Sequence, residues 1–442
     1  MYILILNKIK EITQHPGVRK YFKNSSWLLA EKVFRLIIGL FVGVWVAKYL
    51  GPESYGLFSY AQSIVVIITI VASLGVDGIL VRELINHKDK RDELLGTAFT
   101  LRLIGAIIVI LITIIAISLL PHERDTNIII IVITGAVFFQ CFNVIDFYFQ
   151  SEVLSKYIVR ANMISLLISS IAKVILILYN APLLAFATMM VVDSVIFGIG
   201  YIYIYYKQNL SLFIWKFNYA MAKRLLKDSW PLIFSSFVLM IQARIDQVMI
   251  KNMLGNSEVG YYSVALKLIE SVAFVTIILK TSLSPSVIKA KSISTELYEN
   301  RLQNLYRINM IAFLIVALPI YFLADHIISI LYGEKYANTG ILLSIMASRL
   351  YFANLGTARA VYLMVENLFK YALFTMILGT IVNIILNYYW IAEYGTKGAV
   401  YASIISFFVT IFVVDLFYTK TRRNLWLMIK STFTFYRLNV KL

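Results

Sequence analysis

Charge and cysteine are both scarce in this chain of 442 residues: only 15% are Asp, Glu, Lys or Arg, and Cys141 is the single cysteine. One cysteine excludes a disulfide within the chain, and its place inside the apolar run 128–149 predicts a small buried hydrophobe. Hydrophobic residues make up 60% of the sequence, and the mean hydropathy is +0.79. A soluble domain could not cover that much apolar surface with polar groups, so the lipid bilayer must be the solvent.

Catalytic and metal-binding motifs are missing as well. The sequence has no His-x-x-x-His or Cys-x-x-Cys pair, no Gly-rich phosphate loop before a Lys, and no Gly-x-Ser-x-Gly elbow. The loops are short, the longest lying near 207–229 and 283–307, whereas membrane glycosyltransferases and polysaccharide polymerases generally carry a sizeable external loop. We therefore expect a protein that is not an enzyme and has no cofactor or resident metal. An ATP-driven exporter is likewise excluded for this polypeptide alone.

What the chain does have is long apolar runs that are unbroken rather than alternating. In hydrocarbon only helices and closed barrels pair every backbone group, and unbroken runs favour helices. The predicted fold class is therefore an all-α polytopic membrane protein of about twelve spans. The spans lie near 26–50, 57–79, 96–120, 128–150, 158–179, 183–206, 230–250, 259–282, 308–331, 341–364, 371–392 and 398–418. Met1–Leu6 has no leading positive region and no cleavage site after it, so residues 1–25 are predicted to be an interfacial segment rather than a signal peptide.

Basic residues alternate between the two sides of these spans. One side carries 27 Lys and Arg, and the other carries 5, by direct count. Because short basic loops stay in the cytoplasm, both termini are predicted to be cytoplasmic. Topology thus explains most of the formal charge of +17. We expect no nucleic-acid partner, since the basic residues do not form one patch on a soluble surface.

The chain divides into two similar halves. Leu50–Ala61 aligns without gaps on Leu254–Ala265, with a shared Leu, two Gly, a Ser and an Ala, and an aromatic residue before the Ser. Each half holds an even number of spans, so both halves are predicted to enter the membrane in the same orientation, with a cleft between them. The predicted parts after the interfacial segment are an N-terminal six-helix bundle, a cytoplasmic linker, a C-terminal six-helix bundle and a basic cytoplasmic tail, at 26–206, 207–229, 230–418 and 419–442.

Nine basic residues lie inside the predicted spans, where each charge costs at least ~2.5 kcal/mol on insertion scales. Lys32, Arg102 and Lys280 are near enough to span ends for their charged groups to reach the membrane interface. For Lys173 the sequence favours neither the interface nor a cavity. Those assigned to a cavity are Arg35, Arg244, Lys267, Arg349 and Arg359. The acids in or near the spans are Glu31, Asp77, Asp146, Asp193, Asp246, Glu270 and Glu366.

Some of this charge is predicted to be compensated along single helices. The spacing predicts three ion pairs, which are Glu31–Arg35, Lys267–Glu270 and Arg359–Glu366. Bases still outnumber acids, and a cationic cavity suits an anionic substrate because Arg grips phosphate oxygens in a bidentate fashion. Asn383 and Asn387 form a polar stripe on the eleventh span, for which helix–helix hydrogen bonding is favoured over contact with substrate hydroxyls.

Two regions resemble a known family in detail. Residues 27–35 (WLLAEKVFR) and 47–61 (AKYLGPESYGLFSYA) resemble the first two spans of polysaccharide flippases of the O-antigen and capsule type. That family belongs to the superfamily shared with multidrug and toxin extrusion (MATE) exporters. Residues 244–250 (RIDQVMI) and 260–270 (GYYSVALKLIE) look like the family's seventh and eighth spans. Span count and topology extend the resemblance over nearly the whole chain.

The resemblance implies a MATE-like fold and transport across the bacterial inner membrane. The implied substrate is an oligosaccharide repeat unit linked through diphosphate to a polyprenol such as undecaprenol, in lipopolysaccharide or capsule biosynthesis. We assign the five cavity bases to its anionic head group, and Glu31, Asp246 and Glu270 to orienting those bases or coupling to Na+ or H+. Membrane lipids and polysaccharide polymerase machinery are the other expected partners.

Two rival functions share this fold. An ion-coupled multidrug exporter handles mostly organic cations and should have acids in excess in its cavity, whereas bases dominate here. A lipid-linked peptidoglycan precursor flippase often carries additional spans, which the twelve predicted here do not include. The alternative outside transport is a membrane scaffold or an accessory subunit of a polysaccharide synthase complex. Such a protein would not need the charges deep in the spans, which cost free energy there and give no structural benefit.

Overall fold

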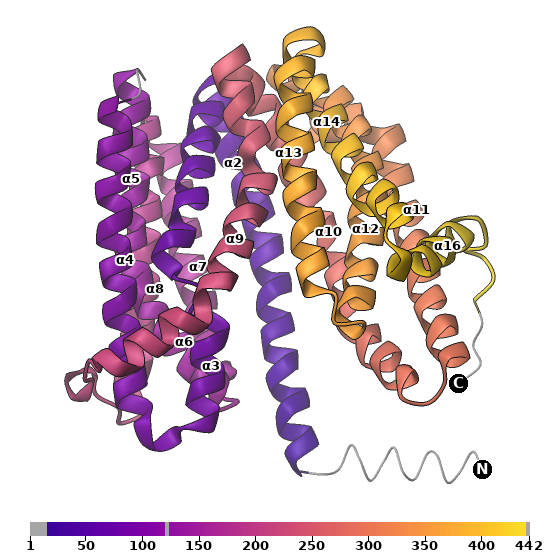
Figure 1. The fold of residues 1–442 in the computed structure, drawn as a ribbon. Helices are drawn as coiled ribbons and strands as arrows, with labels where there is room; N and C mark the ends of the chain where they lie inside the picture. Colours follow the sequence, from indigo (N-terminus) through magenta and orange to yellow (C-terminus); the bar gives the residue numbers. More distant parts are fainter. Residues whose placement is uncertain (1–15, 120–122, 439–442) are drawn as a thin grey trace. The chain divides into compact units, whose positions relative to one another are not determined.

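The structure is a computed structural model that describes residues 16–119 and 123–438, so most of the predicted interfacial segment lies outside the described residues. Throughout the described part the regular secondary structure is helical (Figure 1). The α-helices are α2 (Pro16–Ser73), α3 (Asp77–Asn86), α4 (Arg91–Leu119), α5 (Arg124–Phe139), α6 (Val144–Ser151), α7 (Ser155–Leu178), α8 (Leu183–Lys207), α9 (Tyr219–Leu254), α10 (Asn256–Lys291), α11 (Thr295–Tyr332), α12 (Thr339–Val365), α13 (Phe369–Tyr394), α14 (Thr396–Phe408), α15 (Val414–Phe417) and α16 (Thr419–Phe433). Short helical segments between them are η1 (Lys88–Lys90), η2 (Gln140–Asn143), η3 (Leu212–Ile214), η4 (Glu334–Tyr336) and η5 (Val409–Val413).

Among the described residues, 11 helical segments are long and apolar enough to cross a membrane, by length and composition. The first, Asn24–Asn86, is 63 residues long and contains the first two predicted spans. These two spans are separated inside α2 at Gly51, whose φ of 70° leaves the helical region, and by Pro52 after it. Twelve predicted spans therefore correspond to 11 helical segments, and the predicted all-α multi-pass membrane fold is confirmed.

The described residues form two compact units that differ from the predicted halves. The first unit contains 16–46, 64–119 and 123–237, and the second contains 47–63 and 238–438. Both α2 and α9 contribute residues to each unit. The turn inside α2 therefore packs with the C-terminal helices, although sequence order placed it in the N-terminal bundle.

The predicted linker 207–229 is built into the first unit. The Trp215 indole N–H donates to the Tyr205 hydroxyl at 3.1 Å, and the backbone N–H of Asn218 donates to Thr97 Oγ1 at 3.0 Å. From Tyr219 onward the segment already forms the first turns of α9. Hydrogen bonds that the charge pattern does not reveal therefore fix this segment to α4 and α8.

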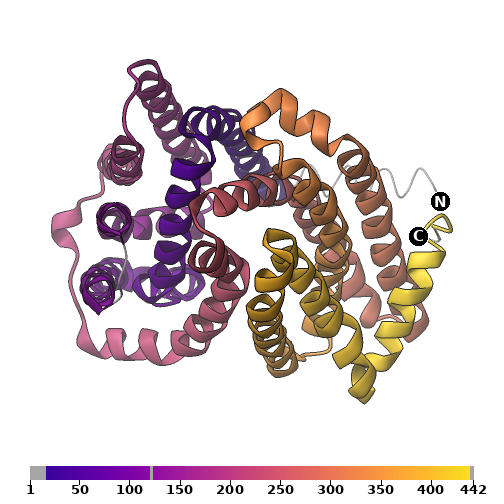
Figure 2. The same cartoon turned by 90° about the horizontal axis from the view of Figure 1, so that it is seen from above.

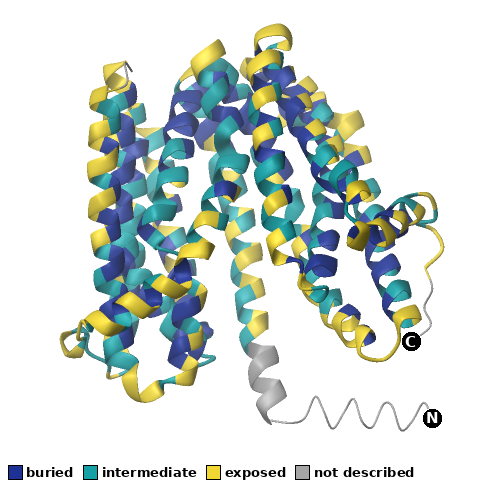
Figure 3. Ribbon diagram, in the orientation of Figure 1, coloured by how far each residue is buried: buried dark blue, intermediate teal, exposed yellow. Residues whose placement is uncertain are grey.

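The helices have buried residues on one side and exposed residues on the other (Figure 3). In the first unit, Leu80, Leu95, Phe149 and Tyr205 belong to one buried apolar cluster contributed by α3, α4, α6 and α8. The other side of α4 is apolar and exposed, and its residues include Ile104, Ile107, Leu111 and Ile115. Exposed apolar rows of this kind suit contact with lipid chains, as expected of helices that cross a bilayer.

The predicted basic tail contains a helix, α16, that packs on the second unit. Figures 1 and 2 show α16 lying across, rather than along, the other helices of this unit. Asn424 accepts a hydrogen bond from the Tyr306 hydroxyl at 2.7 Å, and Arg423 pairs with Glu299 at 2.7 Å. Both partners lie on α11, so the tail is fixed to the transmembrane helices as far as it is described.

The repeated sequence motif has the same backbone role in both halves. Gly51 and Gly255, the first glycines of the two copies, have φ values of 70° and 99°, which favour glycine. The second glycines, Gly56 and Gly260, lie where the two copies touch inside the second unit. A Cβ on Gly56 would lie 2.8 Å from Gly260 N, and one on Gly260 would lie 2.9 Å from the carbonyl carbon of Pro52. Turn geometry and close backbone approach therefore explain why both glycines are shared.

This contact predicts that Gly260→Ala lowers stability. The added methyl group meets backbone atoms rather than a flexible side chain, and overpacking of this kind costs about 1–3 kcal/mol. We expect the thermal unfolding midpoint of the purified protein to fall by roughly 1–3 °C. Gly39→Ala in α2 is the control, since nothing lies within 4 Å of that position. An unfolding midpoint for Gly260→Ala equal to that of Gly39→Ala would contradict the close approach.

Candidate functional site

In the first unit, the predicted Glu31–Arg35 pair is confirmed on α2, with Nη2 and Oε1 2.7 Å apart. Glu31 also accepts a hydrogen bond from Asn162 of α7 at 2.9 Å, and the Arg35 guanidinium lies 5.4 Å from the ring centroid of Phe197 on α8. Asp146 of α6 is within electrostatic range of both charged groups. The side chain of Arg35 is 48% exposed and that of Glu31 only 12%. Arg35 is thus held at one end and keeps further N–H donors that could bind an anion.

In the second unit, Asp246 of α9 is a carboxylate only 2% exposed. It accepts hydrogen bonds from the Tyr262 hydroxyl of α10 at 2.5 Å, the Ser403 hydroxyl of α14 at 2.6 Å and the Asn387 amide of α13 at 2.7 Å. Asn387 also donates to Asn383 Oδ1 within α13 at 3.2 Å, and the Asn383 amide donates to the Ser403 hydroxyl of α14 at 3.5 Å. The bonds from Asn387 to α9 and from Asn383 to α14 confirm the predicted helix–helix hydrogen bonding of the Asn stripe. Asp246 forms no ion pair with any described residue. All three direct donors are uncharged, and they come from three helices.

A second polar chain adjoins this carboxylate. Ser63 of α2 donates to Gln247 Oε1 at 2.6 Å, and Gln247 donates to the Ser263 hydroxyl at 2.6 Å. All three side chains are buried. Sequence reasoning gave none of them a role, although Gln247 stands directly beside Asp246 on α9. That adjacency was the signal that could have identified it.

Arg244 and Lys267 are arranged differently from the prediction. Arg244 of α9 pairs with Glu270 of α10, with Nη1 and Oε1 3.1 Å apart. The predicted Lys267–Glu270 pair is therefore wrong, because the carboxylate has a partner on the neighbouring helix. Lys267 is half-buried and forms no ion pair with any residue the structure describes.

Arg349 of α12 is a second base without an ion pair among the described residues. Its guanidinium lies over the ring of Phe407, 5.2 Å from the centroid, and the side chain is partly buried. Arg349 is also within electrostatic range of Tyr262, the hydroxyl donor to Asp246. An uncompensated guanidinium therefore lies near the buried carboxylate.

Arg359 has a structural partner that sequence reasoning missed. Its Nε and Nη2 donate to the two carboxylate oxygens of Asp415 at 2.8 and 2.6 Å, and the Tyr371 hydroxyl donates to the same carboxylate at 2.8 Å. The side chains of Arg359 and Asp415 are 6% and 0% exposed. The predicted pairing of Arg359 with Glu366 is wrong, since Glu366 pairs with Lys291 at 2.6 Å. The signal for Asp415 was its position inside the last predicted span, 398–418.

Two other bases inside the spans are also paired. Arg102 is buried, pairs with Asp77 and donates to the Gln140 carbonyl at 3.1 Å, so its side chain is held inside the first unit. Lys173 of α7 pairs with Asp193 of α8 at 2.6 Å. Five of the nine bases thus have acidic partners in their own unit. The bases that form no ion pair with any described residue are Lys32, Lys267, Lys280 and Arg349.

Long apolar helices that hold charged and polar groups in their interiors place this chain in one class: multi-pass membrane proteins. Three solved structures of that class share the fold. A multidrug resistance MATE family transporter of the MOP superfamily in an inward-facing conformation is 16% identical, with a TM-score of 0.69 and coverage of 90% of this chain and 96% of that chain. The lipid II flippase MurJ in an inward closed conformation is 17% identical, with a TM-score of 0.68 and coverage of 92% and 91%. A MOP superfamily transporter from Pyrococcus furiosus, described as having a binding pocket of reverse polarity, is 15% identical, with a TM-score of 0.62 and coverage of 95% and 96%.

The sequence itself identifies the family. A family model described as "Polysaccharide biosynthesis protein" matches residues 21–272, more than half of the chain. The chain therefore belongs to the polysaccharide biosynthesis protein family. Comparison with curated proteins finds no significant match.

Proposed function

We propose that this protein is a flippase that moves polyprenyl-diphosphate-linked oligosaccharide repeat units from the cytoplasmic to the outer face of the bacterial inner membrane by alternating access. Membership of the polysaccharide biosynthesis family is the observation that carries the proposal. In this proposal both termini are cytoplasmic, as the 27-to-5 asymmetry of basic residues predicts. The product is a surface glycan such as O-antigen or capsule.

The charges inside the spans support an anionic substrate over an organic cation. After pairing, Lys267 and Arg349 keep their charge without an acidic partner in the described residues, and Arg35 and Arg244 keep donors beyond their single ion pairs. A diphosphate offers the acceptors that these groups lack, and charge-assisted hydrogen bonds are about twice as strong as neutral ones. Arg359 is not included among the proposed substrate-binding bases, because its guanidinium already donates hydrogen bonds to both carboxylate oxygens of Asp415.

The Asp246 cluster is the proposed site of the coupling ion, Na+ or H+. A carboxylate buried in a membrane is costly, and such groups commonly belong to ion or proton pathways. Asp246, Tyr262 and Ser403 supply oxygen atoms, and Asn387 Oδ1 is buried without a hydrogen-bond partner in the structure. Oxygen ligands around one carboxylate suit a hard cation such as Na+, and a single carboxylate can equally take up a proton.

Loss of this protein is expected to stop surface polysaccharide production and to leave lipid-linked repeat units accumulated on the cytoplasmic face. Extraction and mass spectrometry of the lipid-linked intermediates in a depletion strain measure this directly. Accumulation of lipid II instead would assign the peptidoglycan precursor, and increased sensitivity to cationic drugs alone would assign a drug exporter. Unchanged surface polysaccharide without accumulated intermediates would overturn the proposal.

Arg349→Ala is expected to reduce export by at least about tenfold at normal protein levels, because a charge-assisted contact to the head group contributes ~1.5–3 kcal/mol. Arg349→Lys should retain part of the activity, since it keeps the charge but loses the bidentate geometry. Surface polysaccharide measured against membrane-inserted protein is the readout. Full export by Arg349→Ala would remove this residue from the substrate site.

A further inference from the structure

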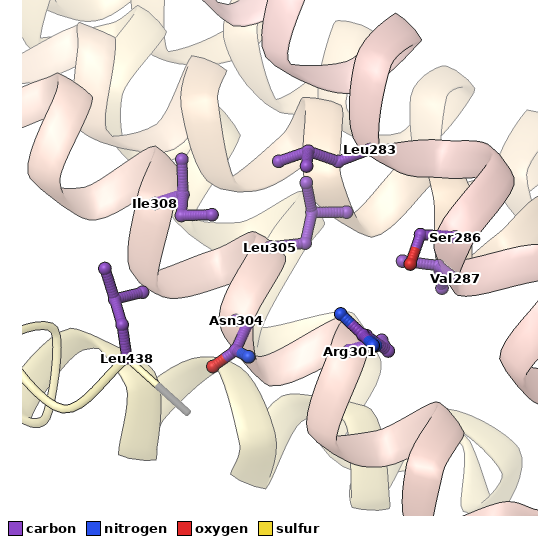
Figure 4. Close-up of a pocket in the computed structure, with 8 residues that line it drawn as sticks. All are labelled: Leu283, Ser286, Val287, Arg301, Asn304, Leu305, Ile308 and Leu438. Carbon is purple, nitrogen blue, oxygen red and sulfur yellow. The ribbon is translucent and has the colours of Figure 1, made fainter. Parts of the chain in front are cut away.

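A cavity of about 190 Å³ lies in the second unit between α10 and α11 (Figure 4). Its apolar lining comes from Leu283 and Val287 of α10, Leu305 and Ile308 of α11, and Leu438 beyond α16. The positions on each helix are three or four residues apart, so they fall on one face. These two apolar faces line the same cavity.

One part of the cavity is polar and cationic. Ser286, Arg301 and Asn304 complete its lining, and Figure 4 shows the Arg301 side chain among the lining residues, near Ser286 and Val287. Arg301 is partly buried and forms no ion pair or hydrogen bond with any described residue. Glu299, an acid two positions away, is bound instead by Arg423 through two hydrogen bonds of 2.9 and 2.7 Å.

The surroundings add positive charge. Arg307, one turn and a half further along α11, donates to Thr434 Oγ1 at 3.1 Å and has no acidic partner among the described residues. Arg437 lies close enough to Arg307 to act on it electrostatically. An anion at Arg301 would therefore enter a region of surplus positive charge.

We propose that this cavity binds an anionic phospholipid, with the lipid phosphate on Arg301 and the first methylene groups of a chain along the apolar walls. A guanidinium without a partner supplies the bidentate donors that a phosphate oxygen pair accepts. The apolar lining would be of no use to a free phosphate ion, but it suits the aliphatic part of a lipid. Only the phosphate and the adjoining methylene groups fit in about 190 Å³, so the rest of the lipid lies in the bilayer. The site is independent of the transported substrate.

Native mass spectrometry of the purified full-length protein tests this site. We expect phosphatidylglycerol to bind about fivefold more tightly than phosphatidylcholine with the same acyl chains. Arg301→Gln should abolish that preference. Arg422→Gln, which removes an exposed arginine of α16, should retain it. Ile308→Trp, which fills the apolar part of the cavity, should weaken binding of both lipids, and it supplies a second test that keeps the charge unchanged.

Two results would overturn the proposal. The first is the same preference for phosphatidylglycerol in Arg301→Gln as in the unsubstituted protein, which would assign the binding to general surface charge. The second is displacement of phosphatidylglycerol by millimolar inorganic phosphate together with unchanged lipid binding in Ile308→Trp, which would make free phosphate the ligand. Thermal unfolding of each variant, measured in parallel, shows that the comparison is made between folded proteins.

Discussion

Asp246→Asn is expected to reduce export of the lipid-linked substrate by at least about tenfold while leaving the protein folded. Asparagine has the shape of aspartate, and the hydroxyls of Tyr262 and Ser403 can rotate to accept a hydrogen bond as well as donate one. The packing of α9 against α10, α13 and α14 should therefore survive. What the substitution removes is the negative charge, and with it the ability to take up a proton or hold a cation.

Reconstituted vesicles give the decisive measurement. In the unsubstituted protein, an imposed Na+ or pH gradient should drive transport, and Asp246→Asn should lose the response to that gradient. Ser403→Ala is the matched comparison, since it removes one oxygen atom of the proposed ion site but keeps the charge of the carboxylate. We expect it to change transport by no more than about fivefold, since one such bond contributes on the order of 1 kcal/mol. Gradient-driven transport by Asp246→Asn equal to that of the unsubstituted protein would refute the coupling role.

The spans could be predicted from the sequence because the bilayer imposes a local rule. Each backbone polar group must be paired within its own helix, so every crossing appears as one continuous apolar run. The single exception in helix count is α2, where two predicted runs form one helical segment with a break at Gly51. Even there, the repeated Leu-Gly motif marked the position of the turn.

Partners inside the membrane were predictable only where they are local in sequence. Glu31 and Arg35 are four residues apart on one helix, and the structure confirms their pair. Glu270 instead pairs with Arg244, and Glu366 pairs with Lys291 on α10. Helix packing determines these partners, and the sequence alone does not show which helices are neighbours.

The division into units was unpredictable for the same reason. The turn around Pro52 belongs with α10 because Gly56 and Gly260 allow two backbones to touch, and Glu53 accepts hydrogen bonds from Asn256 at 2.9 Å and Ser257 at 2.5 Å. The motif revealed that the two halves are related. It did not reveal that its two copies bind each other.

Arg359→Ala is expected to destabilise the second unit by roughly 3–5 kcal/mol, because it leaves the carboxylate of Asp415 buried without its charged partner. Thermal unfolding of the purified protein and the level of membrane-inserted protein measure this effect. Arg423→Ala is the control. It breaks another Arg–carboxylate pair of the same unit, in which the side chains are 66% and 25% exposed, and it should cause a much smaller loss.

The double variant Arg359→Met with Asp415→Asn separates a structural role of this arginine from a role in substrate binding. If the pair is structural, removing both charges removes the unpaired buried carboxylate, and most of the stability lost in Arg359→Ala should return, together with export. Tyr371 can still donate its hydroxyl hydrogen to the amide oxygen that replaces the carboxylate. A substrate-binding arginine behaves in the opposite way: Arg359→Ala would stay folded and lose export, and the double variant would export no better. That second pattern would show that Arg359 binds the substrate despite its ion pair with Asp415.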